Sequence, residues 1–196
     1  MTNNGCKKET EKMKNVVDIR DEFFDNGNRI STQSMKDLIW HIENDPSPDL
    51  AILLVTDAHF MELAPLIARH LDHEDDFIRE LTVGCVVGRL QLVEYAEKAL
   101  NMVQEDPDSG PRVLATSSLG CVLNKVDPIL KKRIAIYLYD VIINPEYDDT
   151  YKRCTFDSIL DAMDIPVPQQ LTIRYDENHD LVKQFKAKYD VQSKIV

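Results

Sequence analysis

The chain has 196 residues, 43% of them apolar, which suffices for one substantial buried core and does not require a second domain. Lys and Arg number 23 against 34 Asp and Glu, and the resulting net charge of −11 repels nucleic acid and acidic lipid, so we expect neither as a partner. The opening MTNNGCKKETEKMKN lacks the apolar core of a signal peptide, and no later run is as long and apolar as a membrane span, so we expect a soluble cytoplasmic protein.

Apolar periodicity predicts helices almost throughout the chain, after a polar stretch that we interpret as a disordered tail. A short amphipathic helix is expected at NVVDIRDEFF, ending at the turn signal DNGN. A second helix is expected at SMKDLIWHIEN, with Ser34 as N-cap and Asp37 in a capping-box arrangement, and a third at DLAILLVTDAHF after the break DPSP. Further apolar-periodic segments are joined by short polar connections, at 62–71, 76–90, 93–104, 111–125, 128–143 and 150–163.

The pattern changes near the C-terminus. IPVPQQLTIRY is rich in proline and then β-branched, which favours an extended segment over another helix. DENHDLVKQFKAKYD is predicted to form a final helix, because its apolar residues fall on one helical stripe. The stripe consists of Leu181, Val182, Phe185 and Tyr189. The alternative for this stretch is a mobile basic tail.

Two of the predicted helices repeat each other. RELTVGCVV, which begins at Arg79, matches RVLATSSLG, which begins at Arg112, at an offset of 33 residues. A weaker copy, KRCTFDSIL, begins at Lys152. Each copy follows an acidic turn, HEDD, QEDPDS or NPEYDD, and each turn follows another apolar helix. We therefore expect a series of antiparallel helical hairpins.

This repeated unit of helix, acidic turn and helix with a basic residue near its start resembles HEAT repeats, which belong to the armadillo-like α-solenoids. The resemblance covers about residues 60–164, with 34–59 as a divergent first pair, and its best single match is the R-x-x-A-x-x-x-L-G run from Arg112 to Gly120. The first copy has Thr82 where a small Ala is usual, and the third copy has lost the Gly, so the number of repeats stays open.

The resemblance implies an all-α fold, a right-handed α-solenoid of stacked antiparallel hairpins. Under this fold the chain divides into a disordered tail at 1–14, a HEAT-like helical repeat domain at 15–164, and an extended segment with a C-terminal capping helix at 165–196. A capping helix is expected because the end of a stack needs a polar outer face.

Stacking explains the recurring residues without a ligand. One hairpin cannot bury its apolar face alone, and small residues let neighbouring helices approach closely; these are Gly84, Gly88, Ala115 and Gly120. The turn acids cap the following helix and favour the positive end of its dipole. The basic residue one turn further on can pair with an acid of its own turn or of the adjacent turn. We call this expected arrangement the Asp–Arg ladder.

The stretch HLDHEDDFIREL, residues 70–81, holds two histidines three apart, with the acids Asp72, Glu74, Asp75 and Asp76 around them, as a metal site on one helix would. We instead place His70 at the end of a helix and His73 in the turn after it, which breaks their shared face. A zinc or iron site, and with it a metal-dependent enzyme on the same scaffold, is the alternative. The deoxyhypusine hydroxylases, a HEAT-type family, bind iron through repeated His-Glu pairs, whereas His73-Glu74 is the only such pair here. We therefore predict no metal and no cofactor.

Catalytic patterns are missing from the sequence. The four cysteines are far apart and form no pair at zinc-ligand spacing, so we interpret them as reduced thiols with no visible activating base. No nucleotide-binding, metalloprotease or serine-hydrolase motif occurs, and Ser117 and Ser118 are interpreted as ordinary helix residues. HEAT-like DNA glycosylases share the architecture but need a basic cleft, which an acidic chain lacks. We therefore predict no catalytic residues.

The turn acids form the candidate binding surface. Equivalent turns line up on one edge of a stack, so we expect an acidic ridge that attracts a basic protein, with two tyrosines as aromatic anchors. The alternative is that the acids are solvated helix caps and the tyrosines pack within the last hairpin. The predicted partner-binding residues are Glu74, Asp75, Asp76, Asp106, Asp108, Asp148, Asp149, Tyr147 and Tyr151.

The sequence thus predicts a non-enzymatic module for protein–protein interaction. Its most concrete version is an immunity protein, which binds and blocks a basic toxin. The alternative is a scaffold or adaptor that binds a peptide or helix in its concave face.

Overall fold

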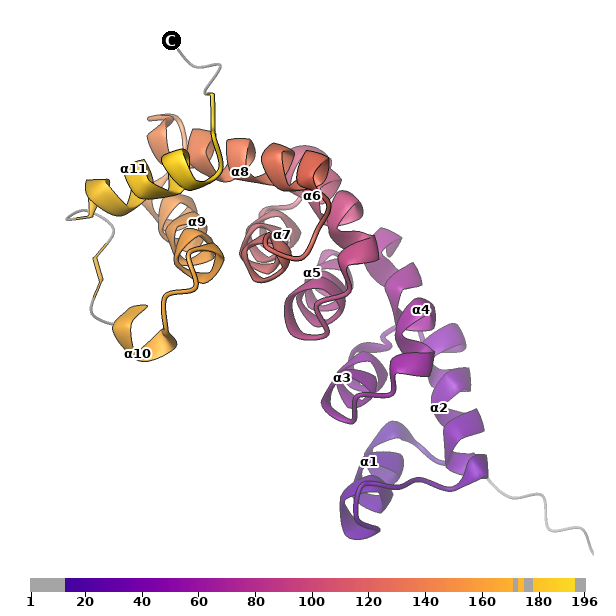
Figure 1. Cartoon of the computed structure of the whole chain (residues 1–196). Helices are drawn as coiled ribbons and strands as arrows, with labels where there is room; N and C mark the ends of the chain where they lie inside the picture. Colours follow the sequence, from indigo (N-terminus) through magenta and orange to yellow (C-terminus); the bar gives the residue numbers. More distant parts are fainter. Residues whose placement is uncertain (1–12, 171–172, 175–177, 193–196) are drawn as a thin grey trace, which may run out of the picture.

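The helices form two layers that follow an arc (Figure 1). The structure is a computed structural model that describes residues 13–170, 173–174 and 178–192, and all regular structure within these ranges is helical. The layer on the concave side, the inner layer, comprises α1 (Val16–Asp25), α3 (Asp49–Asp57), α5 (Asp76–Val83), α7 (Ser109–Val122) and α9 (Asp149–Ala162). The outer layer comprises α2 (Thr32–Asn44), α4 (Ala64–Ile67), α6 (Ala96–Glu105) and α8 (Pro128–Ile143).

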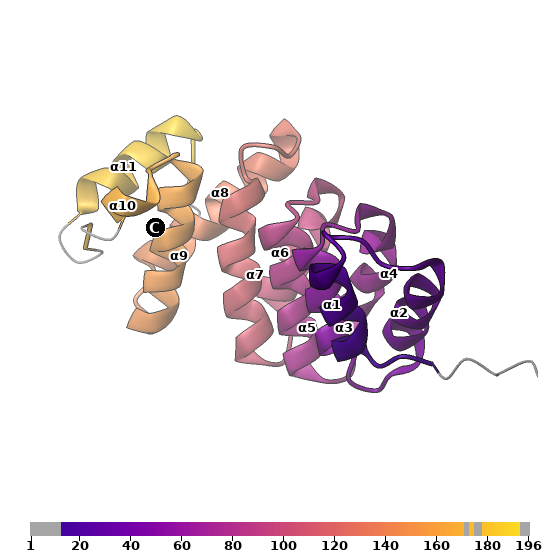
Figure 2. The same ribbon diagram turned by 90° about the horizontal axis from the view of Figure 1, so that it is seen from below.

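Each inner helix packs against the next one along the chain. Contacts join α1 to α3, α3 to α5, α5 to α7 and α7 to α9, and α6 and α8 pack on the inner helices that follow them. Figure 2 shows this succession from α1 to α9 from below. One apolar core runs between the layers, and Ala115 and Leu119 of the central helix α7 are fully buried in it. The all-α prediction is confirmed.

Small residues allow the close approach of α5, α7 and α9. A Cβ added to Gly120 would lie 2.6 Å from the Cα of Ser158, and one added to Gly84 would lie 2.7 Å from a methyl group of Leu114. The buried Ser158 hydroxyl donates to the carbonyl oxygen of Thr116 at 3.1 Å, which adds a polar contact between α7 and α9. The expectation that Gly84 and Gly120 serve helix packing is confirmed.

Helix α2 begins earlier than predicted. Its N-cap is Ser31, whose hydroxyl accepts a hydrogen bond from the Ser34 backbone N–H at 3.1 Å. Ser34 is fully buried inside the first turn, and its hydroxyl donates to Glu22 of α1. The prediction of Ser34 as N-cap was wrong, because this serine lies within α2 and links it to α1 through the hydrogen bond to Glu22.

Two predicted helices are less regular than their periodicity suggested. The segment predicted at 62–71 consists of the 3-10 turn Met61–Leu63, helix α4 and the 3-10 turn Ala68–Asp72. The segment predicted at 76–90 is α-helical up to Val83 and continues as a π-helix over Gly84–Arg89. Apolar spacing of three and four residues does not distinguish these helix types, since all of them bury one side.

The predicted disordered tail at 1–14 ends in an ordered residue. Residues 1–12 of the predicted disordered tail lie outside the described residues, but Lys14 is anchored to α2 and α1. Its N–H donates to Asp37 at 3.0 Å, its carbonyl oxygen accepts from Nε2 of His41 at 2.8 Å, and its ammonium group donates to Glu22 at 2.6 Å. The bonds from Lys14 and Ser34 lower the pKa of Glu22 to about 2.

The C-terminal prediction was partly wrong and partly confirmed. The predicted extended segment contains a short helix, α10 (Val167–Gln170), in which the Pro166 carbonyl oxygen accepts from the N–H groups of Gln169 and Gln170. Proline is compatible with a first helical turn, since its missing N–H would have no partner there. The final helix forms as α11 (His179–Lys188), which packs on α8 and fully buries Phe185.

Every helix in the part of the chain that the structure describes is too short or too polar to cross a membrane.

Candidate functional site

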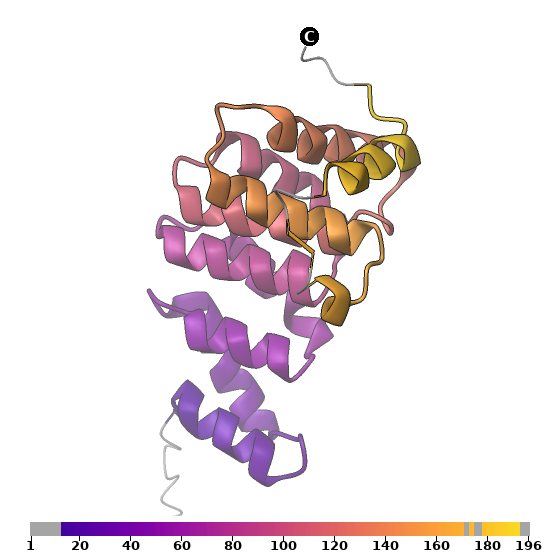
Figure 3. The ribbon, with the colours of Figure 1, turned by 90° about the vertical axis from the view of Figure 1, so that its left-hand side faces the viewer.

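The acidic turns share one edge of the molecule. Figure 3 shows the turns that precede α5, α7 and α9 following one another along the side where these helices begin. Asp75, Asp108 and Asp148 are the N-cap residues of the three helices. The sequence predicted this alignment from the repeat, and the figure agrees with it.

A hydrogen-bond acceptor in the C-cap side chain begins the turn after each of four outer-layer helices, the 3-10 turn Ala68–Asp72 included. Four C-cap side chains accept a hydrogen bond from the backbone N–H two residues later, at 2.9–3.1 Å: Asp45, His73, Asp106 and Asn144. Each of these residues has an extended backbone, which ends its helix and starts the turn. Sequence reasoning missed this device, although its signal, an Asp, His or Asn just before the next N-cap, is visible.

The two histidines of HLDHEDDFIREL have structural roles. Nε2 of His70 donates to the Ile42 carbonyl oxygen at 2.9 Å, and burial lowers the pKa of this imidazole. Nδ1 of His73 accepts from the N–H of Asp75 at 3.1 Å. The ring centroids are 5.6 Å apart, closer than a broken helical face led us to expect. Within the ranges that the structure describes, no three His, Cys, Asp or Glu side chains group as metal ligands.

Arg79 joins two successive turns. Its Nε and Nη2 donate to the two carboxylate oxygens of Asp106, both at 2.9 Å, and Nη2 also donates to Asp108 at 2.7 Å. Nη1 donates to the carbonyl oxygens of His73 and Glu74 at 2.8 and 3.0 Å. A bidentate pair of this kind is the strongest common geometry between a guanidinium and a carboxylate. Arg79 thus confirms the Asp–Arg ladder at one position.

The same contacts involve two of the predicted binding residues, and they remove one of them from the free surface. The Asp106 side chain is only 5% exposed. Burial raises the pKa of its carboxyl, but the hydrogen bonds from Arg79 and the Asp108 N–H and the charges of Arg79 and Arg112 together outweigh burial, and the net effect is a lowered pKa. Asp108 is half-buried and paired with Arg79. Asp106 is therefore not part of the exposed surface that was predicted, whereas the Asp108 side chain stays 48% exposed and its role toward a partner stays a prediction.

Arg112 occupies the same position in α7 but has no such pair. Arg79 and Arg112 each follow the N-cap of their helix by four residues. No hydrogen bond or ion pair reaches the Arg112 guanidinium from the described residues, and its buried Nε has no acceptor. The Asp–Arg ladder therefore stops at Arg112, where the prediction of a continuous ladder was wrong.

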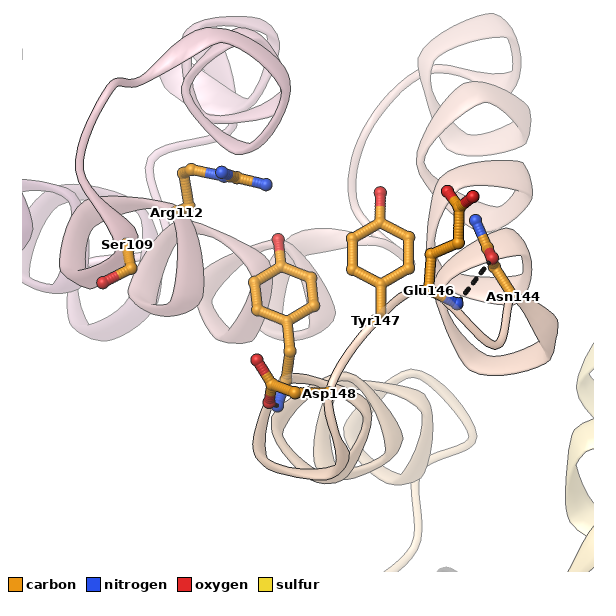
Figure 4. A pocket seen from close by; sticks show the side chains of 7 residues that line it. Ser109, Arg112, Asn144, Glu146, Tyr147 and Asp148 are labelled. Carbon is orange, nitrogen blue, oxygen red and sulfur yellow. Dashed lines mark hydrogen bonds between the residues drawn. The ribbon is translucent and has the colours of Figure 1, made fainter.

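A cavity of about 380 Å³ lies beside Arg112. It is lined by Ser109 and Arg112 of α7, Tyr151 of α9 and four residues of the turn between α8 and α9, namely Asn144, Glu146, Tyr147 and Asp148. In Figure 4 the Arg112 side chain extends toward this turn, and Tyr147 stands between it and the pair of Glu146 and Asn144.

The tyrosines of this turn differ in their roles. Tyr151 is 7% exposed, and its hydroxyl is within hydrogen-bond distance of Thr116, at 3.0 Å, and of Tyr137. Tyr147 is half-buried and stacks on Tyr151, with ring centroids 5.2 Å apart and an interplanar angle of 13°. The prediction of Tyr151 as a surface anchor was wrong because this ring packs within the last hairpin, whereas Tyr147 lines the cavity.

The remaining predicted binding residues are exposed, and they are Glu74, Asp75, Asp76, Asp148 and Asp149. Asp75 caps α5 by accepting from the N–H groups of Phe77 and Ile78, and Asp148 caps α9 by accepting from that of Tyr151 at 2.8 Å. The caps that the alternative interpretation expected are therefore present. Each cap uses one of the two carboxylate oxygens of its aspartate.

The cysteine thiols and the Ser118 hydroxyl were the other side chains considered as nucleophiles. Burial raises the pKa of the Cys85, Cys121 and Cys154 thiols, which keeps them protonated at neutral pH. The Ser118 hydroxyl is buried and donates to the carbonyl oxygen of Val83, so it has a packing role.

No family model, curated protein or solved structure matches this chain.

Proposed function

We propose that the chain is a HEAT-like, right-handed α-solenoid that binds a basic protein through the acidic edge where α5, α7 and α9 begin. An immunity protein that blocks a basic toxin is the most concrete version of this proposal. Two layers of helices, packed in chain order with equivalent turns on one edge, support the proposed solenoid. The binding surface consists of Glu74, Asp75, Asp76, Asp148 and Asp149, with Tyr147 beside them.

One observation carries the proposal: several exposed acids on this edge form no ion pair with the part of the chain that the structure describes. Among the described residues, Glu74, Asp76 and Asp149 form no side-chain ion pair or hydrogen bond. Some exposed acids elsewhere have cationic partners, whereas Asp25, Glu62 and Glu94 form no ion pair with the described residues. Asp57 pairs with Arg89 at 2.5 Å, and Glu97 pairs with Arg133 at 2.6 Å.

The physical effect of such an edge is mainly on association. Carboxylates without counter-charges give a negative potential that steers a basic partner and raises the association rate. Because exposed charges are screened over about 8 Å at physiological ionic strength, the complex should weaken as salt is added. A net charge of −11 on the whole chain adds to the same attraction.

Charge reversal tests the proposal. The variant with Glu74→Lys, Asp76→Lys and Asp149→Lys is compared with wild type as bait for native lysate, at about 0.05 M and about 0.5 M salt. A matched control reverses Asp21, Glu43 and Glu62, which are exposed acids outside this edge, and so changes the net charge by the same amount. We expect wild type and control to retain one basic protein at low salt and the edge variant to lose it. Mass spectrometry identifies the protein, and the product of a neighbouring toxin gene is the expected result for an immunity protein.

Two outcomes would contradict the proposal. One is capture of the same partner by the edge variant and wild type. The other is equal loss in the edge variant and the control, since net charge alone would then explain the attraction.

A second candidate is a scaffold whose concave face binds a helix or peptide, and it is favoured by exposed apolar side chains in the inner layer. Val17 and Phe24 of α1 are 41% and 59% exposed, and Leu50 of α3 is 46% exposed. These three residues border a small groove between α1 and α3. A partner that resists salt but is lost in Phe24→Asp would support this function and argue against the acidic edge.

A further inference from the structure

Arg79 and Arg112 provide an internal comparison of one position in two surroundings. Both follow the N-cap of an inner helix by four residues, and both are directed at the turn before the next inner helix. In the first case the C-cap residue of that turn is Asp106, which binds Arg79 through both carboxylate oxygens. In the second case the corresponding C-cap residue is Asn144, a neutral amide.

The second turn is also longer. Its C-cap and N-cap, Asn144 and Asp148, are four residues apart, whereas Asp106 and Asp108 are two apart. The longer turn places Tyr147 in the space next to Arg112, and a cavity of about 380 Å³ remains. The Arg112 side chain is half-buried and its Nε has no acceptor, which is a costly state for a charged donor.

We propose that this cavity binds a small flat molecule that bears a carboxylate, and that Arg112 holds the carboxylate as Arg79 holds Asp106. The ligand thereby supplies the group that Asn144 lacks. The site adjoins the acidic edge, with which it shares Asp148 and Tyr147, and it is a binding activity beyond the proposed function.

The lining restricts the class of ligand. Glu146 and Asp148 border the same cavity as Arg112, so a monoanion meets less repulsion there than a phosphate dianion does. Tyr147 offers an aromatic surface that is held in place by stacking on Tyr151. A flat ring beside the carboxylate matches this surface.

A second cavity gives the body of the ligand further space. It has a volume of about 530 Å³, shares Arg112, Asn144 and Tyr147 with the first, and lies against α6 and α8. Apolar side chains contribute to its lining, including Leu100 and Ile136. Arg112 thus borders a polar cavity on one side and a partly apolar cavity on the other, which suits a molecule with one charged end.

Nuclear magnetic resonance of the ¹⁵N-labelled chain tests this site, with benzoate as the probe and phenyl phosphate and benzamide as comparisons. We expect benzoate to shift the Nε–H signal of Arg112 and the backbone signal of Tyr147 in a saturable manner. Benzamide has the same ring without the charge and is expected to bind about tenfold more weakly or not at all.

Two variants change the site in opposite ways. Arg112→Gln removes the guanidinium and should weaken benzoate binding about tenfold or more. Asn144→Asp supplies an internal carboxylate, so it should occupy Arg112, raise the urea midpoint of unfolding and abolish benzoate binding. Arg69→Gln, an exposed arginine of another turn, is the control and should bind benzoate as wild type does.

Several outcomes would overturn the inference. They are the absence of a saturable shift in wild type, equal binding in Arg112→Gln, or tighter binding of phenyl phosphate than of benzoate. Circular dichroism of each variant shows whether it folds, and if Asn144→Asp fails to fold, Tyr147→Ala replaces it, with an expected loss of benzoate binding. The acidic-edge variant changes Glu74, Asp76 and Asp149, none of which lines this cavity, so the two proposals fail separately.

Discussion

The turn that binds Arg79 and the turn that Arg112 faces occupy equivalent positions between successive helices, but they offer the arginine different side chains. In the first, two carboxylates surround a guanidinium that is 10% exposed. Three hydrogen bonds from Arg79 join two successive hairpins, and two more go to the turn before its own helix. In the second, an amide replaces the main carboxylate, the turn is longer, and a cavity adjoins the arginine. The comparison teaches that a repeat fixes where a side chain lies but not what it does there.

The largest predicted difference between the two turns concerns removal of the arginine. Arg79→Met leaves Asp106 buried without its counter-charge, and we expect a loss of about 3–5 kcal/mol in the free energy of unfolding. Arg112→Met removes a donor that has no acceptor, so its effect should stay within about 1 kcal/mol. Urea denaturation followed by circular dichroism measures both. Equal losses in the two variants would contradict the comparison.

Helix packing on the two sides of α7 should differ as well. In Gly120→Ala the new Cβ meets the backbone of Ser158, which cannot move aside, and we expect a loss of about 1–3 kcal/mol. In Gly84→Ala the new Cβ meets only the flexible end of Leu114, and the gain of helix propensity offsets part of the strain. Thermal unfolding of the two variants checks this order, and a larger loss for Gly84→Ala would reverse it.

Acid should weaken the Arg79 turn more than the Arg112 turn. The pKa of Asp106 is lowered in the folded protein, so the unfolded chain binds its proton more readily. The stability that this carboxylate contributes is therefore complete above its unfolded pKa of about 4 and is lost as the pH falls through the lower folded value. The stability difference between wild type and Asp106→Asn should shrink over this range. A difference that stays constant with pH would exclude the effect.

Helix capping gives the smallest predicted difference. Asp148 caps α9 with a hydrogen bond to the N–H of Tyr151, whereas Asp108 makes no side-chain cap bond and pairs with Arg79 instead. Asp148→Ala should therefore cost about 1 kcal/mol, and its exposed neighbour in Asp149→Ala should cost little. Urea midpoints of the two variants decide this, and equal midpoints would show that the cap contributes nothing.

The sequence predicted most of the fold because the repeat is visible in residue type. The apolar spacing located the helices, and the match of Arg79 with Arg112 placed both residues at the same point of their hairpins. Helix type within 61–72 and 84–89 was not predictable, since 3-10, α and π turns bury similar patterns of residues.

The candidate site was less predictable than the fold. Counting acids in a turn does not tell which of them is used by a neighbouring hairpin, and Asp106 was assigned to the surface for this reason. The unpaired state of Arg112 depends on one amide and on the length of a turn, whose consequence appears only when the hairpins are packed together. The exposed acids Glu74, Asp76 and Asp149 were identified correctly as surface residues.

A pair of double-mutant cycles tests the central contrast between the two turns most directly. Unfolding free energies are measured for Arg79→Met, Asp106→Ala and the double variant, and likewise for Arg112→Met, Asn144→Ala and their double variant. We predict a coupling of about 2–3 kcal/mol between Arg79 and Asp106, and a coupling within about 0.5 kcal/mol of zero between Arg112 and Asn144. Comparable coupling in the two pairs would contradict the account, because Arg112 would then have a partner within the fold.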